Sequence, residues 1–189
     1  MLFVTQKEFY ECLEDSPIIA SVHENLFEEA LVSPSSVIFL LGGNLITVGD
    51  RIKAAKESGK KIFVHIDLAD GIGKDKTGIE FLARCGADGI ISTRANLIRT
   101  AKDFGMLTVQ RFFVYDTQGV DSINEILYNS SPDIVEIMPG VIGKIIQQFS
   151  ASGLPLVAGG LIETKAEVTS ALNLGAFAVS TGKKELWYI

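Results

Sequence analysis

Short apolar runs rich in β-branched residues alternate with helix-like segments along the whole chain, and this alternation most strongly constrains its fold. Eight runs are predicted to be strands, at residues 18–22, 37–42, 61–67, 89–93, 107–114, 134–138, 154–160 and 176–181. Seven segments between them have helical spacing, at residues 26–31, 48–58, 77–84, 97–104, 122–128, 141–152 and 166–174. Three capping-box pairs are expected to mark helix starts: Thr5/Glu8, Ser122/Glu125 and Thr164/Glu167. Strands joined by helices pair in parallel through right-handed crossovers.

Such a chain forms either a closed (β/α)8 barrel or a doubly wound open sheet. Eight regular units without a long interruption favour the barrel, so we predict one α/β domain over residues 1–189, a compact TIM barrel. Because this fold usually needs roughly 250 residues, we expect short connections and a shortened or missing last helix. Residues 2–14 are expected to form an extra helix that covers the bottom of the barrel.

Composition limits the class of protein. The hydrophobic content of 47% fits parallel strands that are covered on both faces. The N-terminus has no signal-peptide pattern, and no apolar run reaches the roughly 18 residues that span a bilayer, so we expect no membrane partner. Cys12 and Cys85 form neither a disulfide framework nor a CxxC spacing, which predicts a cytoplasmic protein with reduced thiols. A net charge of −6 argues against an extended nucleic-acid surface but leaves a local basic patch open.

Glycine and hydroxyl residues follow the last two predicted strands, where LPLVAGG spans 154–160 and AFAVSTG spans 176–182. In TIM barrels the loops after strands seven and eight commonly bind phosphate through backbone amides and a helix N-terminus. Free N–H groups of a helix opening near Thr164 and the charge of Lys183 would add to such a site. The alternative is an ordinary tight turn and an ordinary strand end. The predicted phosphate-binding residues are Gly159, Gly160, Ser180, Thr181 and Gly182.

Four ionisable residues lie inside otherwise apolar strands, close to their C-terminal ends: His65, Asp67, Arg111 and Glu136. Burying such groups is costly unless they are paired or contact ligand or water. We therefore predict that they line a ligand pocket. The alternative is an internal Arg111–Glu136 ion pair, with His65 hydrogen-bonded to a carboxylate, that merely fills the barrel mouth.

Other chemistry has weaker support. Asp67, Asp70 and His65 could hold a divalent cation, but no third carboxylate is fixed nearby, so no metal or other cofactor is predicted. Residues 70–78 meet neither the Walker A nor the GxGxxG spacing and form either a mobile flap or an exposed turn. Lys183 is the lone lysine beyond a strand end, which disfavours a Schiff-base aldolase. His23 is either a mouth residue or an exposed imidazole.

Several segments resemble the glycerol-3-phosphate-responsive antiterminator family, which regulates bacterial glycerol-uptake operons. They are VHIDLADGIGKDKTGIEFL (64–82), GADGIISTRANLIRTAKDFGMLTVQRFF (86–113), EIMPG (136–140), LPLVAGGLI (154–162) and AVSTGKKELW (178–187). The resemblance runs over residues 16–187. It implies a (β/α)8 barrel that binds glycerol 3-phosphate and acts on leader messenger RNA to prevent early termination of transcription.

Carried over by position, the resemblance assigns the phosphate to Gly159, Gly160, Ser180 and Thr181. The rest of the pocket would be lined by His65, Asp67, Arg111 and Glu136. Gly182 departs from the family, because a small polar residue is expected there.

RNA binding rests on the resemblance alone. It needs cations for phosphates and commonly aromatic or arginine platforms for bases. The two basic stretches lack interleaved aromatic residues, and solvated helix faces explain both. They are Arg51, Lys53, Lys56, Lys60 and Lys61, and then Arg94, Arg99 and Lys102.

The sequence thus leads to a regulator without catalytic residues that binds glycerol 3-phosphate and does not turn it over. Two alternatives stay open. One is an enzyme, a phosphodiesterase or isomerase of phosphorylated metabolites, with His65 and Asp67 or Glu136 as acid and base. The other is a barrel with degenerate sites that serves only as a protein partner. The expected partners are glycerol 3-phosphate and leader mRNA, with a homo-oligomer left open.

Overall fold

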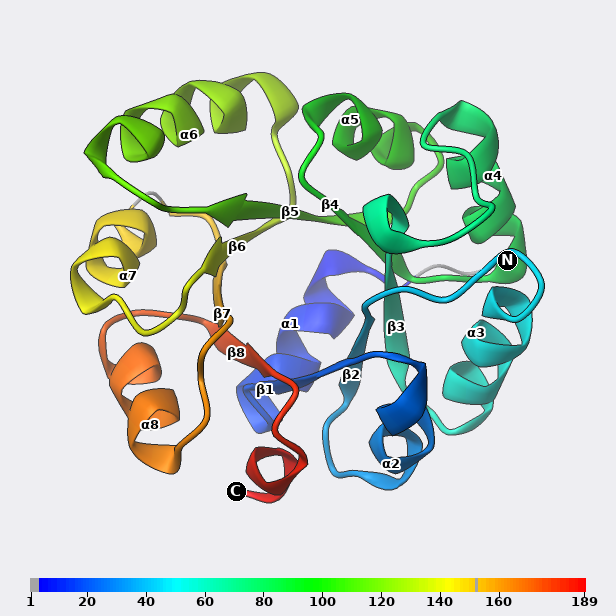
Figure 1. Cartoon of the computed structure of the whole chain (residues 1–189), viewed down its shortest axis with the longest axis horizontal. Helices are drawn as coiled ribbons and strands as arrows, with labels where there is room; N and C mark the ends of the chain where they lie inside the picture. Colours follow the sequence, from blue (N-terminus) through cyan, green and yellow to red (C-terminus); the bar gives the residue numbers. More distant parts are fainter. Residues whose placement is uncertain (1–3, 152) are drawn as a thin grey trace.

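Eight parallel strands close into a barrel in sequence order (Figure 1). The computed structural model describes residues 4–151 and 153–189, without the side chains of residues 117, 118, 120–122 and 124. The predicted TIM barrel is confirmed, because β1 pairs with β8 and places Ile19 opposite Ser180. The strands are β1 Ile18–Val22, β2 Val37–Leu40, β3 Lys61–His65, β4 Gly89–Ser92, β5 Leu107–Phe113, β6 Ile134–Met138, β7 Leu156–Gly159 and β8 Ala178–Thr181.

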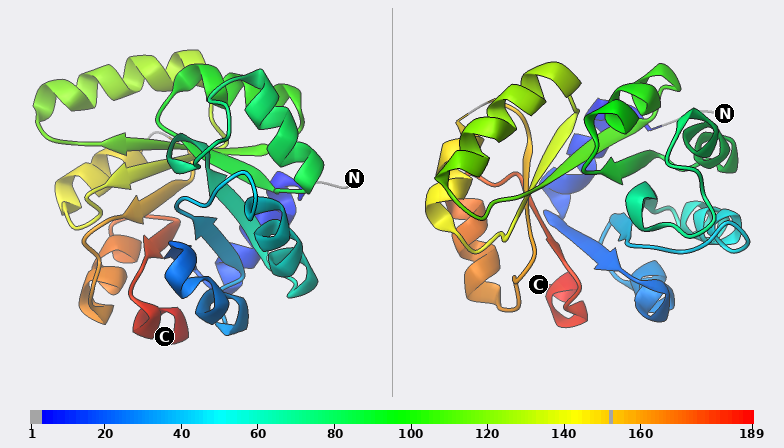
Figure 2. Two further views of the ribbon diagram at one scale, coloured as in Figure 1. Left: turned by 45° about the vertical axis from the view of Figure 1, so that its right-hand side comes forward. Right: turned by 45° about the horizontal axis from the view of Figure 1, so that its top comes forward.

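Helices form the outer layer, as the two further views in Figure 2 show. They are α1 Gln6–Asp15, α2 Phe27–Val32, α3 Val48–Glu57, α4 Lys76–Cys85, α5 Ala95–Asp103, α6 Thr117–Ser130, α7 Gly143–Ser150 and α8 Lys165–Asn173. Short 3-10 helices are η1 Glu24–Leu26, η2 Ile66–Leu68 and η3 Lys184–Tyr188. Since only η3 follows β8, the last helix of the barrel is shortened as predicted. Among the described residues, no helix combines the length and apolarity that a membrane crossing requires.

Two of the predicted capping boxes are present and the third is misplaced. Thr5 with Glu8 and Thr164 with Glu167 begin α1 and α8. Helix α6 instead begins at Thr117, because the Asp116 side chain accepts a 2.8 Å hydrogen bond from the Gly119 N–H. The expected cap at Ser122 falls inside this helix, and its side chain lies outside the described part. The predicted helix ends at residues 2–3 and 152 also lie outside the described residues.

Helix α1 closes the N-terminal end of the barrel. Phe9 of α1 is fully buried, and its ring centroid lies 5.1 Å from that of Phe63 on β3. Phe63 in turn lies 5.6 Å from Phe39 on β2. Figure 1 shows α1 behind the barrel, on the far side from the viewer. Because this end is filled by apolar side chains, a ligand site has room only at the C-terminal ends of the strands.

Replacing Phe9 by alanine tests the contribution of α1 to the core. We expect Phe9→Ala to lower the free energy of unfolding by about 3–5 kcal/mol, because a buried aromatic ring is lost and a cavity remains. Urea unfolding followed by fluorescence of the buried Trp187 measures the change. Lys7→Ala, on the exposed side of α1, is the control and should stay within about 0.5 kcal/mol of wild type. Equal stability of the two variants would contradict this role.

Candidate functional site

A cavity of about 410 Å³ opens at the C-terminal ends of β7, β8 and β1. Four of the predicted phosphate-binding residues line it, because β7 and β8 are neighbours and their loops lie at one end of the barrel. The lining consists of Ser21, His23, Leu41, Met138, Gly160, Leu161, Ile162, Glu163, Ser180, Thr181, Gly182 and Lys183. Gly159 is absent from this lining and has a different role, described below.

The loop between β7 and α8 has an unusual backbone. Gly160 has φ +75°, and Leu161 has φ +60°, a value in the left-handed region that bulky residues rarely adopt. Leu161 is also 69% exposed, so it gains little from burial. Holding such a residue costs about 1–3 kcal/mol, and such strain clusters at functional sites. The strained turn brings the backbone of this loop to the cavity wall.

The Glu167 carboxylate occupies two backbone donors just before α8. It accepts hydrogen bonds of 2.9 Å from the N–H groups of both Glu163 and Thr164. These bonds lower the pKa of Glu167. The Thr164 hydroxyl accepts 3.2 Å from the Glu167 N–H, which completes the capping box. A role of this helix N-terminus in phosphate binding stays a prediction.

Thr181 joins the two loops that flank the cavity. Its Oγ1 donates to the Ile162 carbonyl at 2.8 Å and accepts from the Lys183 N–H at 3.1 Å. The Thr181 carbonyl accepts a 2.9 Å hydrogen bond from Nε1 of the buried Trp187 in η3. The terminal ELW segment therefore has a structural role: it fixes the end of β8.

A buried polar layer lies inside the barrel at the level of Ser180. The Glu136 carboxylate, fully buried, accepts 2.6 Å from Arg111 Nε and 2.5 Å from Ser180 Oγ. A Cβ on Gly159 would lie 2.6 Å from both Glu136 Oε1 and Ser180 Oγ. Glycine is therefore required at 159 to leave room for this contact. The Arg111–Glu136 ion pair, which the sequence analysis gave as the alternative to a ligand contact, is present, and Ser180 connects it with the cavity.

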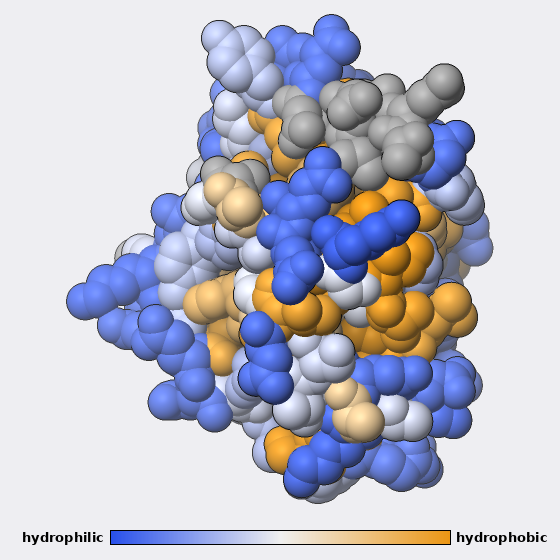
Figure 3. Space-filling model, turned by 90° about the vertical axis from the view of Figure 1, so that its left-hand side faces the viewer, coloured by the Kyte–Doolittle hydropathy of each residue, from blue (hydrophilic) through white to orange (hydrophobic). Residues whose placement is uncertain are grey.

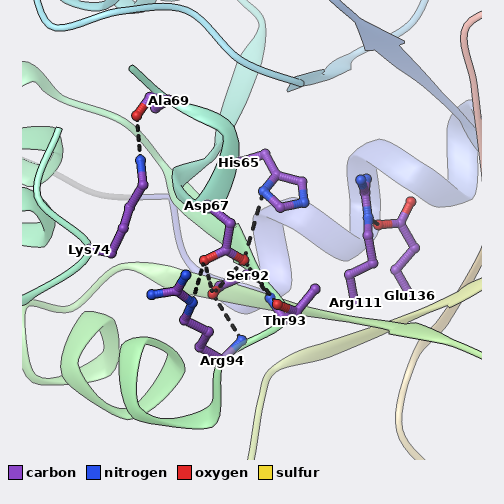
Figure 4. A network of polar contacts seen from close by, with 9 residues as sticks. All are labelled: His65, Asp67, Ala69, Lys74, Ser92, Thr93, Arg94, Arg111 and Glu136. Atoms are coloured by element: carbon purple, nitrogen blue, oxygen red, sulfur yellow. Dashed lines mark hydrogen bonds and ion pairs between the residues drawn. The ribbon is translucent and has the colours of Figure 1, made fainter. Parts of the chain in front are cut away.

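His65 lies between Asp67 and Arg111 (Figure 4). Burial, followed by the nearby Arg111 charge, lowers the pKa of His65 to about 4, so the imidazole is neutral at pH 7. Its Nδ1 is 4.0 Å from Asp67 Oδ2, too long for a hydrogen bond. His65 Nδ1 and Arg111 Nη2 are both buried without a hydrogen-bond partner. Buried polar groups are normally satisfied, so these two atoms are candidates for contact with a ligand or water.

The Asp67 carboxylate holds the end of β4 and the loop that follows it. Its carboxylate accepts 2.8 Å from the Thr93 N–H and 3.0 Å from Ser92 Oγ, and lies 3.4 Å from Arg94 Nε (Figure 4). None of the four predicted pocket residues, His65, Asp67, Arg111 and Glu136, is among the residues that line the 410 Å³ cavity. The structure thus brings His65, Arg111 and Glu136 together with Ser180 and places Asp67 at the edge of this group.

The loop over residues 70–78 is attached to its surroundings. The Asp70 N–H bonds the Gly43 carbonyl at 2.9 Å, and Lys74 Nζ bonds the Ala69 carbonyl. Asp75 caps α4 by accepting 3.0 Å from the Gly78 N–H. Within the described ranges, no three His, Cys, Asp or Glu side chains are grouped as a metal site.

These features define a (β/α)8 barrel with a small polar cavity at its C-terminal face. The family model for the glycerol-3-phosphate responsive antiterminator matches residues 18–187, and the chain belongs to this family. Membership supports a role in transcription antitermination.

Two solved structures and one curated protein are similar over most of the chain. The glycerol uptake operon antiterminator regulatory protein of Listeria monocytogenes is 34% identical, with a TM-score of 0.87 and coverage of 92% of this chain and 95% of that one. A related protein of Thermotoga maritima is 31% identical, with a TM-score of 0.81 and coverage of 90% and 96%. The uncharacterized protein YgcP of Escherichia coli K12 is 34% identical over 93% of both chains.

Sequence reasoning missed several lining residues: Ser21, Leu41, Leu161, Ile162 and Glu163. Ser21 had a usable signal, because a hydroxyl inside the apolar run 18–22 is unusual. Leu161 had none, since its left-handed backbone is imposed by the loop around it.

The buried His65 predicts how stability depends on pH. With a pKa of about 4 when folded and 6.5 when unfolded, the unfolded chain binds more protons between these values, so stability rises with pH. We expect about 3 kcal/mol to be lost as the pH falls from 6.5 to 4. Unfolding curves at several pH values measure this loss, which His65→Gln should abolish and His23→Gln should retain. A His65→Gln variant with the wild-type pH slope would contradict the assignment.

The role of Gly159 is tested by Gly159→Ala. The added methyl group would press on buried Glu136 and Ser180, so we expect a loss of about 1–3 kcal/mol. Gly49→Ala is the matched control, because its Cβ would meet Cys85 Sγ at an ordinary 3.7 Å. Thermal unfolding measures both, and unchanged stability of Gly159→Ala would contradict the tight packing of this layer.

Proposed function

We propose that this protein is a regulator that binds glycerol 3-phosphate in the 410 Å³ cavity, does not turn it over, and acts on leader mRNA. The observation that carries the proposal is a polar cavity at the β7 and β8 loops in a chain of the antiterminator family. This is the place where TIM barrels commonly bind phosphate.

The phosphate end of the ligand fits the outer part of the cavity. Gly160 and Gly182 allow close approach of an anion to the backbone, and Lys183 adds a positive charge. Glu163 lines the same cavity, and its negative charge would disfavour a second phosphate group. This arrangement suits a small monophosphate.

The glycerol end fits the inner part. Ser180 lines the cavity and also donates to Glu136, so it connects the cavity with the buried polar layer. The unpartnered Arg111 Nη2 and His65 Nδ1 belong to that layer. Hydroxyl groups of the ligand would satisfy such atoms directly or through water.

The use of the polar groups supports the absence of turnover. Asp67 is held by Ser92 and Thr93, and Glu136 by Arg111 and Ser180. The pKa of His65, about 4, lies well below the range in which a general base works best at neutral pH. Two of the three candidates are thus held by the fold, and the third has a poorly matched pKa.

A thermal-shift titration tests ligand binding. At a hundredfold excess over the dissociation constant, glycerol 3-phosphate should add about 2.7 kcal/mol of stability. Glycerol, inorganic phosphate and dihydroxyacetone phosphate are the comparison ligands and should stabilise less. Lys183→Gln should weaken glycerol 3-phosphate binding about tenfold, because a charged hydrogen bond is worth roughly 1.5–3 kcal/mol.

The control is Lys184→Gln, which changes the adjacent exposed lysine outside the cavity lining and should bind like wild type. Equal loss in both variants would indicate a general charge effect instead of a built site. Formation of product from glycerol 3-phosphate would overturn the proposal in favour of an enzyme.

A further inference from the structure

The basic side chains that the sequence offered for RNA are largely occupied within the molecule. On and near α3, Arg51 pairs with Glu24 and Glu28, Lys53 with Glu57, and Lys56 with Asp88. Lys60 donates to the Ser33 and Ser35 carbonyls. On α5, Arg99 donates to the Asn129 carbonyl, and Lys102 contacts Asp133 and the Ser131 carbonyl. These side chains are therefore poor candidates for an RNA surface.

An exposed aromatic pair stands at the mouth of the barrel instead. Phe113 ends β5 and Tyr115 follows it, with ring centroids 6.3 Å apart and planes inclined by 15°. Phe113 is 46% exposed and Tyr115 is 88% exposed. Near-parallel exposed rings present a flat π face to solvent, which is the geometry on which unstacked RNA bases bind.

Cations follow the two strands next to β5. Arg94, after β4, has a side chain 54% exposed, with its Nε 3.4 Å from Asp67, and the exposed Lys144 lies in the first turn of α7, after β6. The nearby Asp116 is engaged as the cap of α6. Figure 3 shows hydrophobic side chains gathered on the face of α6, α7 and α8, toward the mouth side and bordered by hydrophilic ones. The exposed Val141 and Leu161 belong to the same end of the barrel.

We propose that Phe113 and Tyr115 form the platform on which bases of single-stranded RNA stack, with Arg94 and Lys144 contacting the adjacent phosphates. The inference rests on the proposed action on leader mRNA and names its surface. Positive charge on both sides of an aromatic face complements a polynucleotide, in which phosphates alternate with bases.

The platform is also in contact with the ligand cavity, through Met138. Phe113 lies opposite Met138 in the sheet, and the Val114 N–H donates 2.8 Å to the Met138 carbonyl. The Met138 side chain lines the cavity, and its methyl carbon is 2.6 Å from where a Cβ on Gly160 would stand. Met138 therefore lies between a ligand bound at the Gly160 loop and RNA bound on the platform. This contact predicts that glycerol 3-phosphate changes RNA affinity.

The test uses two tyrosines of nearly equal exposure. Fluorescence anisotropy with in-vitro transcribed leader RNA of the glycerol-utilisation genes, with and without glycerol 3-phosphate, compares wild type with Tyr115→Ala and Tyr128→Ala. We expect Tyr115→Ala to bind RNA about tenfold more weakly or worse, because a stacking surface is lost. Tyr128, 87% exposed near the far end of α6, should be replaceable without effect. Tyr115→Trp should retain binding, and RNA should quench its added fluorescence.

The outcomes separate this inference from the proposed function. A wild-type protein that binds the ligand but no leader RNA would contradict the proposed action on RNA. Wild-type RNA affinity in Tyr115→Ala would overturn the platform alone. A change in sedimentation from oligomer to monomer in Tyr115→Ala, without loss of RNA affinity, would also overturn it and assign the pair to a contact between copies. Unchanged thermal stabilisation by glycerol 3-phosphate in Tyr115→Ala shows that its fold is intact.

Discussion

The Glu136 carboxylate is buried inside the barrel, and the geometry of the mouth depends on how it is satisfied. A buried charge costs several kcal/mol unless a partner and hydrogen bonds compensate it. Arg111, which lies opposite Glu136 on β5, supplies the compensating positive charge. Ser180 on β8 donates a hydrogen bond to the same carboxylate. Gly159 on β7 leaves the space that this contact needs. The carboxylate on β6 is thereby bonded to β5 and β8, with β7 leaving room for it, and Ser180 connects this group with the cavity.

This arrangement divides the mouth into two parts. Around β7, β8 and β1, glycine backbone, hydroxyls and Lys183 surround open space. Around β3 and β4, Asp67 is bound to the loop that carries Ser92, Thr93 and Arg94. Because Asp67 and Glu136 are held by the fold, this arrangement fits the proposed recognition of a small phosphorylated polyol better than proton transfer. The same construction leaves the rim at β5 free to serve as a docking surface.

The sequence predicted the barrel well, because eight apolar runs separated by helical spacing leave few topologies open. It also located polar residues near the ends of β5 and β6, because Arg111 and Glu136 interrupt otherwise apolar runs. The role of Gly159 was not visible, since it depends on the contact between Glu136 and Ser180, 44 residues apart. The left-handed backbone of Leu161 also depends on local geometry that residue types do not specify.

The most direct test of a sensor without turnover is phosphorus NMR of glycerol 3-phosphate titrated with the wild-type protein. The account predicts that the single phosphorus resonance shifts or broadens in proportion to occupancy and then stays chemically unchanged during prolonged incubation. An unaffected resonance at high protein concentration would contradict binding, and a new resonance that grows with time would contradict the absence of catalysis.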